Sequence, residues 1–132
     1  MPAAGNSFVA HVTELLGIAG AITSRRMFGG HGIYLDGLFI GIIADDVLYL
    51  KVDAQTENGF RAAGSVPFRY TRQNRVMTLQ FWSAPEDAME SPHLMRPWAR
   101  QAFAAALRAG TAGKRTKKTG RARRPSIRQK SR

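Results

Sequence analysis

The most distinctive chemistry of this sequence lies in a cluster of cations near its carboxyl end. Residues 111–132 contain ten Lys or Arg and no Asp or Glu, and Ile127 is their only large apolar residue. Flexible cations neutralise phosphates and release counterions, so we expect this segment to bind DNA or RNA with little sequence preference. The candidate nucleic-acid-binding residues are Lys114, Arg115, Lys117, Lys118, Arg121, Arg123, Arg124, Arg128, Lys130 and Arg132.

Almost all of the net positive charge of the chain lies in this segment. Residues 1–110 hold ten Lys or Arg against nine Asp or Glu, a net charge of +1, and residues 111–132 carry the remaining +10 of the total of +11. Nearly all of the long-range field therefore belongs to the tail. Anionic membranes are a competing partner, but the tail lacks the aromatic and aliphatic residues that insert beside such charges. A solubilising or targeting role for the tail stays open.

Two other motifs have ordinary structural interpretations. The run from Gly29 to Gly32 could surround a phosphate, but no Lys and Ser or Thr follow it into a helix, so a turn or bulge is favoured. Asp36, Asp45 and Asp46 fall at expected turns and form no calcium-binding loop, so we interpret them as solvated turn carboxylates.

The histidines do not form a recognisable site either. His11 and Glu14 share a helix face and are expected to form a surface pair, while His31 and His93 have no adjacent acid or nucleophile. Without cysteine, the chain cannot form a disulfide, a thiolate metal site or a cysteine nucleophile. We therefore expect no catalytic residue, no cofactor and no metal, and a binding or regulatory protein that is not an enzyme.

Aromatic side chains offer a second route to nucleic acid. The two tryptophans and three tyrosines could stack nucleobases if they gathered on an exposed sheet face near three arginines: Trp82, Trp98, Tyr34, Tyr49 and Tyr70, with Arg69, Arg72 and Arg75. Packing in the core is the alternative, and we favour it for Trp98 because its apolar neighbours recur at helical spacing. For Tyr70 and the arginines a binding surface stays open.

The elements that must position these residues follow from periodicity. Helical spacing predicts an amphipathic first helix that starts near Asn6 or Ser7 and stops near Gly17 or Gly20, with one apolar face: Phe8, Val12, Leu15, Leu16 and Ala19. Short β-like runs then predict a meander of three antiparallel strands, with Asp36-Gly37 as a type I′ hairpin turn. Asp45-Asp46 is expected to form the next turn.

The second half of the chain repeats this alternation. We expect a weaker helix from Asp53 to Ala63 that stops at Gly64, followed by a hairpin of residues 68–72 and 76–82. Ser83 to Glu86 match a capping box, and a last helix, kinked at Pro97 or starting near Arg96, follows. The order α-β-β-β-α-β-β-α predicts a two-layer α+β domain in which helices cover an antiparallel sheet of about five strands.

Composition sets the limits of this domain. We expect the folded part to span residues 1–110 and residues 111–132 to be a disordered tail, because the tail cannot bury enough apolar surface to offset its ordering entropy. No apolar run approaches membrane-spanning length, and the amino terminus has no pattern of an export signal, so we expect a cytoplasmic protein without membrane association.

A set of short motifs, in order and at matching spacing, resembles the TfoX/Sxy N-terminal domain family over residues 8–108. These motifs are Arg25 to Tyr34, Asp36-Gly37, Asp45-Asp46, Leu48 to Lys51, Asp53, Ala62 to Gly64, Pro67 to Tyr70, Phe81-Trp82, Pro85-Glu86 and Trp98 to Arg100. The resemblance implies a bacterial protein with a helix-covered antiparallel sheet, a link to transcription regulation of competence (DNA uptake) and no catalytic residues. Full-length competence regulators of this kind carry a second, helical domain where this chain has its basic tail.

Two functional hypotheses follow. In the first, a regulatory or adaptor protein binds a protein partner through its folded domain and DNA or RNA through its tail. In the alternative, the chain is a stand-alone, non-specific nucleic-acid-binding protein whose folded domain is only a carrier or a homodimerisation module.

Overall fold

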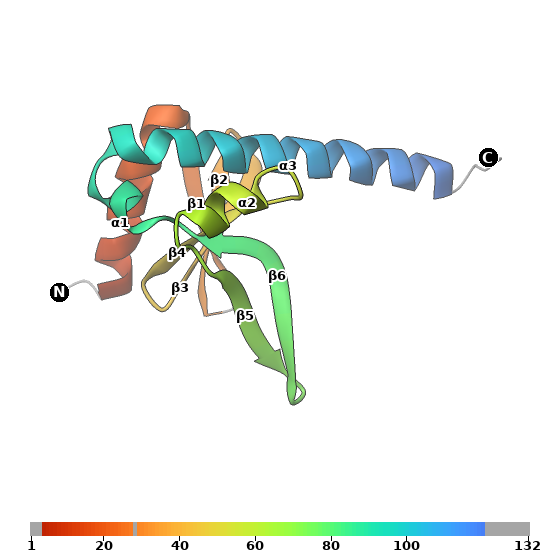
Figure 1. Cartoon of the computed structure of the whole chain (residues 1–132), viewed down its shortest axis with the longest axis horizontal. Helices are drawn as coiled ribbons and strands as arrows, with labels where there is room; N and C mark the ends of the chain where they lie inside the picture. Colours follow the sequence, from red (N-terminus) through yellow and green to blue (C-terminus); the bar gives the residue numbers. More distant parts are fainter. Residues whose placement is uncertain (1–3, 28, 121–132) are drawn as a thin grey trace.

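The computed structural model describes residues 4–27 and 29–120, with side chains described within residues 7–110. It confirms the expected α+β architecture: one antiparallel sheet with helices on one face (Figure 1). The elements are α1 (Ala4–Leu16), the 3-10 helix η1 (Gly17–Ala19), β1 (Ile22–Met27), β2 (Gly30–Leu35), β3 (Leu38–Ala44), β4 (Val47–Lys51), α2 (Glu57–Ala62), β5 (Pro67–Arg72), β6 (Arg75–Ser83), the 3-10 helix η2 (Glu86–Glu90) and α3 (Pro92–Gly120).

The sheet has six strands in the order β1-β2-β3-β4-β6-β5, one more than the sequence predicted. The additional strand is β1, which lies at an edge and pairs antiparallel with β2 from Ile22 opposite Leu35 to Met27 opposite Gly30. Four of its six residues are exposed, so it lacks the alternation of apolar and polar residues that reveals a half-buried strand. The predicted meander therefore begins one strand earlier than expected.

Two-residue turns set the register of the hairpins. At Asp36-Gly37 both backbone φ angles are positive, 48° and 86°, as the expected type I′ turn requires. The same conformation recurs at Asp45-Asp46 (52° and 59°) and at Gln73-Asn74 (53° and 64°). These turns match the right-handed twist of the flanking strands, which keeps consecutive strands adjacent in the sheet.

The core lies between the sheet and the helices α1 and α3. The predicted apolar face of α1 is confirmed, since Val12, Leu15 and Leu16 are buried and Phe8 and Ala19 pack against them. The sheet contributes alternate residues of its central strands, including Ile33, Leu48 and Leu50, and α3 contributes Met95, Ala99 and Ala102. The core thus uses one face of each strand and leaves the other face without a covering layer.

The last helix begins at Pro92 and passes through Pro97 without ending. Ser91 precedes it, and its hydroxyl accepts the Leu94 backbone N–H at 3.2 Å, which satisfies one free donor of the first turn. Trp98 packs edge-on against Phe60 of α2, with ring centroids 4.9 Å apart, as expected of a core residue.

The expected capping box is wrong. Ser83 is the last residue of β6, and its hydroxyl accepts the Val66 backbone N–H at 3.0 Å, while η2 begins after Pro85 without a side-chain cap. Ser83 therefore fastens the start of β5 to the end of β6.

The expected boundary at residue 110 falls inside α3. The helical backbone continues through Gly120 and extends past the rest of the fold (Figure 1), although Gly and Thr, which are poor helix formers, make up half of residues 111–120. The expected disorder of residues 121–132 lies outside the described residues.

Candidate functional site

The ten predicted nucleic-acid-binding cations cannot be placed as a site. Lys114, Arg115, Lys117 and Lys118 belong to the last turns of α3, where the backbone alone is described. The other six, in residues 121–132, lie outside the described part of the chain. The hypothesis that these residues bind nucleic acid stays a prediction.

The uncovered face of the sheet carries two groups of rings in contact. Tyr34 alternates along β2 with the core residues Ile33 and Leu35, and Tyr49 alternates along β4 with Leu48 and Leu50, so both rings point away from the helices. Tyr34 contacts Phe39, which contacts Phe81, and Tyr49 contacts Phe68, which contacts Tyr70. We call these six rings the aromatic face: Tyr34, Phe39, Tyr49, Phe68, Tyr70 and Phe81.

The rings of the aromatic face are in mutual contact across strands. Phe39 lies 5.2 Å from both Tyr34 and Phe81, measured between ring centroids. Phe68 lies 4.8 Å from Tyr49 and 6.1 Å from Tyr70. All of the rings except Phe81 are partly exposed, so they shield one another from water but keep surface available.

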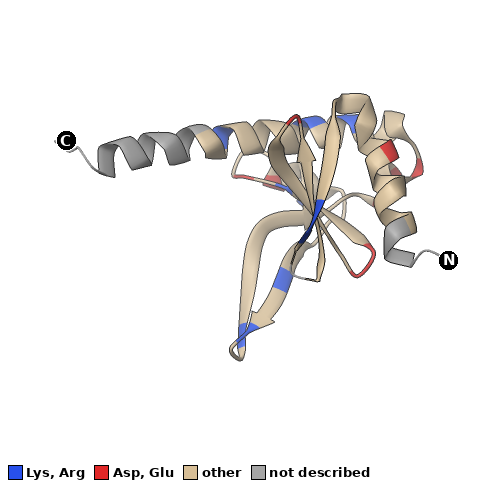
Figure 2. Ribbon diagram, turned by 180° about the vertical axis from the view of Figure 1, so that it is seen from behind, with Lys and Arg blue, Asp and Glu red and all other residues tan. Residues whose placement is uncertain are grey.

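Cations lie among these rings. The Arg25 guanidinium is 5.5 Å from the centroid of Tyr34, and the Lys51 ammonium is 5.0 Å from that of Phe81, within the range of cation–π attraction. Arg72 and Arg75 are directly opposite at the end of the β5–β6 hairpin. No strand contains Asp or Glu, whereas the acidic residues lie in turns, loops and helices (Figure 2). The Lys and Arg side chains are therefore not opposed by any carboxylate within the six strands.

Of the aromatic residues considered from sequence, the tyrosines lie on the aromatic face and the tryptophans do not. Trp82 is opposite the core residue Leu50, is only 8% exposed and is covered by Arg61 of α2. The sequence reasoning missed Phe39, Phe68 and Phe81. Strand alternation from Tyr34 and Tyr49, combined with the hairpin register, was the signal that could have found them.

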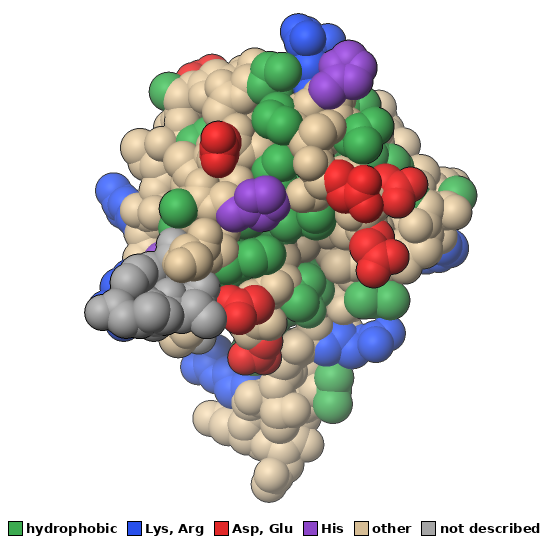
Figure 3. All heavy atoms as spheres, turned by 90° about the vertical axis from the view of Figure 1, so that its left-hand side faces the viewer, with side chains coloured by type: hydrophobic (Ala, Val, Ile, Leu, Met, Phe, Trp, Pro, Cys, Tyr) green, Lys and Arg blue, Asp and Glu red, His purple; other side chains and the backbone are tan. Residues whose placement is uncertain are grey.

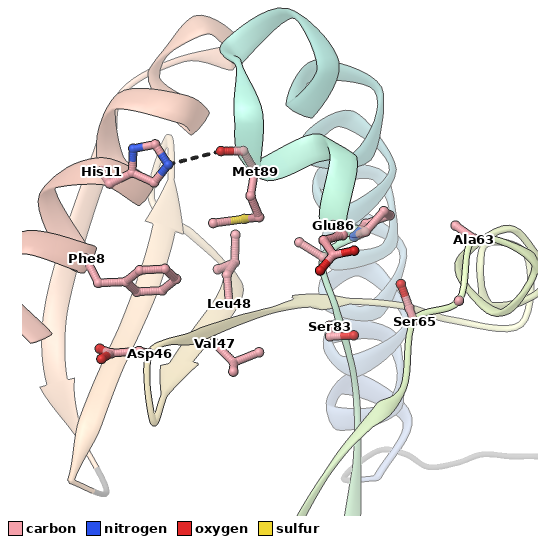
Figure 4. A pocket seen from close by; sticks show the side chains of 13 residues that line it. Phe8, His11, Asp46, Val47, Leu48, Ala63, Ser65, Ser83, Glu86 and Met89 are labelled. Carbon is pink, nitrogen blue, oxygen red and sulfur yellow. Dashed lines mark hydrogen bonds between the residues drawn. The ribbon is translucent and has the colours of Figure 1, made fainter.

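A groove lies where α1, β4 and η2 meet, at the end of the molecule opposite the carboxyl end of α3 (Figure 1). It has a volume of about 670 Å³, and the side chains of Phe8, Val47, Leu48 and Met89 converge in it (Figure 4). Seen from the α1 side, hydrophobic side chains occupy the centre of this end, with acidic side chains and histidine beside them (Figure 3). The groove is thus apolar with a partly acidic border.

Two polar side chains of the groove, His11 and Ser65, differ in their hydrogen bonding. His11 was expected to pair with Glu14, but its Nε2 lies 3.0 Å from the Met89 carbonyl, so it donates to η2 in the tautomer that carries the proton on Nε2. The buried Ser65 hydroxyl has no hydrogen-bond partner within the described residues. A buried hydroxyl without a partner is costly to the stability of the fold.

The carboxylates form no metal centre. Asp36, Asp45 and Asp46 lie in turns, as expected, and the Asp36 carboxylate accepts the Ala21 backbone N–H at 3.0 Å. Within residues 4–27 and 29–120, no three His, Asp or Glu residues gather closely enough to hold a metal ion. Gly29 to Gly32 form the predicted turn into a strand, with a positive φ of 77° at Gly29.

Asp53 makes the principal ion pair between α3 and the rest of the fold. Its carboxylate accepts from the Arg108 guanidinium at 2.5 and 3.0 Å and from the backbone N–H groups of Gln55 and Thr56. The hydrogen bond from Arg108 and these backbone bonds lower the pKa of Asp53 below its ordinary value, against the opposing effect of partial burial. The pair joins the end of β4 to α3 just before the basic segment.

A comparison with family models identifies the folded domain. Residues 14–106 match the model of the TfoX N-terminal domain, which is more than half of the chain. The chain therefore belongs to the TfoX N-terminal domain family, which is associated with the regulation of competence and DNA uptake. No curated protein matches the chain. Among the described residues, no helix is both long and apolar enough to cross a bilayer.

Proposed function

We propose that this chain is a cytoplasmic regulatory protein that binds rather than catalyses, linking a protein partner to nucleic acid in the control of bacterial DNA uptake. The observation that carries the proposal is the separation of charge: +10 in residues 111–132 against +1 in residues 1–110. Family membership supports the connection with competence.

The tail is the nucleic-acid anchor in this proposal. Its cations contact phosphates of any sequence, so binding is strong at low salt and weakens steeply as salt increases. Because α3 continues beyond the other elements, its last turns extend away from the folded body (Figure 1). This geometry lets the tail contact a polyanion while the opposite end of the domain remains accessible.

The groove at that opposite end is the candidate surface for the protein partner. It combines an apolar centre with the exposed Val47 and the unpartnered Ser65 hydroxyl, and Asp46 and Glu86 lie at its border. A partner segment with apolar side chains next to a cation fits this chemistry. In the alternative hypothesis, the domain is a carrier or dimerisation module and the groove has no partner.

The anchor is tested by replacing all ten tail cations with Gln in the full-length chain and measuring retention of duplex DNA and of duplex RNA at low salt. We expect the substituted chain to lose most of its retention, because few phosphates are then neutralised. A control chain carries Arg61→Gln and Arg96→Gln in the folded part, where both side chains are exposed, and should bind normally. Undiminished binding by the tail variant contradicts the proposal.

The partner is tested with the same Gln-substituted chain in a nuclease-treated extract, so that nucleic acid does not bridge proteins to the bait. Affinity purification should recover a defined protein, and Val47→Glu, in the groove, should abolish its recovery. Val76→Glu is the matched control, because Val76 is 68% exposed on β6 and does not line the groove. Recovery of no specific protein favours the carrier hypothesis.

A further inference from the structure

The uncovered face of the sheet carries aromatic side chains where a solvent-exposed sheet face normally carries polar ones. Here the uncovered face presents the six rings of the aromatic face, and five of them are partly exposed. Partly exposed rings that cluster on one face are typical of a site of interaction.

We propose that the aromatic face binds single-stranded nucleic acid, with bases stacked on its rings and phosphates at the cations among them. This site is separate from the tail and is built entirely from described side chains. The bases of a single strand are free to stack on aromatic rings, and such stacking tolerates any sequence because every base has a π face. In a duplex the same base faces are already occupied.

The charge of the sheet identifies the occupant as an anion. Arg25 and Lys51 lie over Tyr34 and Phe81, and Arg72 and Arg75 extend the cationic surface along the β5–β6 hairpin. No strand contributes a carboxylate to oppose them. Phosphates of a strand bound there would meet Arg25 or Lys51 beside the first group of rings, and Arg72 and Arg75 on the hairpin that carries Phe68 and Tyr70.

The same charges disfavour a second copy of this chain as the occupant. A two-fold symmetric contact through this face places identical patches together, so the cations of each copy would face those of the other. Rings in contact across strands also form a surface that bases can cover one after another, with neighbouring centroids 4.8 to 6.1 Å apart.

The first test uses the unmodified chain. An oligothymidylate that contains photoreactive 5-iodouracil is crosslinked at moderate salt, and the modified peptides are identified by mass spectrometry. We expect crosslinks in β2, β4 and β5, at Tyr34, Tyr49, Phe68 or Tyr70. Crosslinks confined to residues 111–132 would overturn the proposal without affecting the tail as an anchor.

The second test separates stacking from folding. Tyr34, Tyr49 and Tyr70 are changed to Leu, or in a matched control to Phe, and affinities for a single strand and for a duplex of equal length are compared. Each Leu should weaken single-strand binding about tenfold, since a stacked base contributes on the order of 1–3 kcal/mol. The Phe variants should bind as the parent does, and duplex binding through the tail should not change.

Two outcomes contradict this inference. If the Leu variants bind the single strand and the duplex with unchanged affinity ratio, the rings do not stack bases. If sedimentation shows a dimer of the parent chain that becomes a monomer in the Leu variants, with no change in single-strand affinity, the aromatic face is a contact between copies. A different result would contradict the tail as an anchor: duplex binding that survives when the tail cations are replaced with Gln.

Discussion

At the scale of single residues, Asp53 combines two roles in one carboxylate. One oxygen accepts backbone N–H groups of the turn before α2, and the carboxylate as a whole pairs with Arg108 on α3. Replacing Asp53 with Ala removes both roles, whereas Asn keeps an oxygen for the turn but loses the charge. The two variants therefore separate capping from ion pairing.

The pKa of Asp53 gives the ion pair a defined pH dependence. Because Arg108 lowers the folded-state pKa below the ordinary 3.8, the pair stabilises the fold above pH 3.8, and this contribution disappears as the pH falls through the lowered pKa. We expect Asp53→Asn to melt at a lower temperature than the parent at pH 7, and the difference to shrink as the pH falls below 3.8. Asp53→Ala should melt at a still lower temperature, because the backbone N–H groups of Gln55 and Thr56 then lose their acceptor. Thermal melts of the parent and the variants across this pH range test the expectation. A melting-temperature difference that stays undiminished at low pH would argue against the ion pair.

Gly30 is a second residue whose identity the packing requires. A Cβ at this position would lie 2.1 Å from the Ile43 carbonyl oxygen on the adjacent strand, and backbone cannot move aside as a flexible side chain does. We expect Gly30→Ala to destabilise the fold by about 1–3 kcal/mol in denaturant unfolding. Gly59→Ala is the control: it lies inside α2, its Cβ would meet only the Gln101 side chain at 3.8 Å, and it should be neutral or stabilising. Equal effects of the two substitutions would contradict this account.

At the scale of elements, α2 depends on one side chain. It spans only Glu57–Ala62, and Phe60 is its one buried residue, in edge contact with Trp98 of α3. Such a short helix is unstable alone, so this contact determines whether it forms.

We therefore expect Phe60→Ala to cost about 3–5 kcal/mol of stability, as is usual for removing a buried phenylalanine. The emission of Trp98 should also shift toward the red, because water gains access to its ring. Leu107→Ala, at a 48% exposed position of α3, should change the free energy of unfolding little. A stability loss for Phe60→Ala as small as that of Leu107→Ala would show that α2 is held by other contacts.

The elements show which features the sequence determined locally. Asp36-Gly37 and Asp45-Asp46 predicted their turns because residues that tolerate positive φ stood between apolar runs, and α1 was predicted because Val12, Leu15 and Leu16 share a helical face. β1 was missed because an edge strand needs no apolar alternation. The aromatic face was recognised only in part, because Phe39, Phe68 and Phe81 become neighbours through strand pairing rather than through sequence proximity.

At the scale of the whole molecule, three surfaces of different chemistry are held apart. The groove at the α1 end is apolar with acids at its border, the aromatic face is cationic, and the basic residues of the tail follow the far end of α3. A nearly neutral net charge in residues 1–110 thus conceals a separation: the six strands carry cations and no acid, whereas every acidic residue lies in a turn, a loop or a helix. In the function proposed above, this arrangement places the protein partner and the polyanion on different surfaces.

The most direct test of the central claim is the salt dependence of duplex DNA binding by the full-length chain. If the ten tail cations contact phosphates, log K should fall linearly with log salt, with a slope approaching about −9 when all are engaged. The chain with Gln in place of these cations should give a slope near zero and weak binding at every salt concentration. A parent slope that is already shallow, or one that the Gln substitutions leave unchanged, would contradict the account.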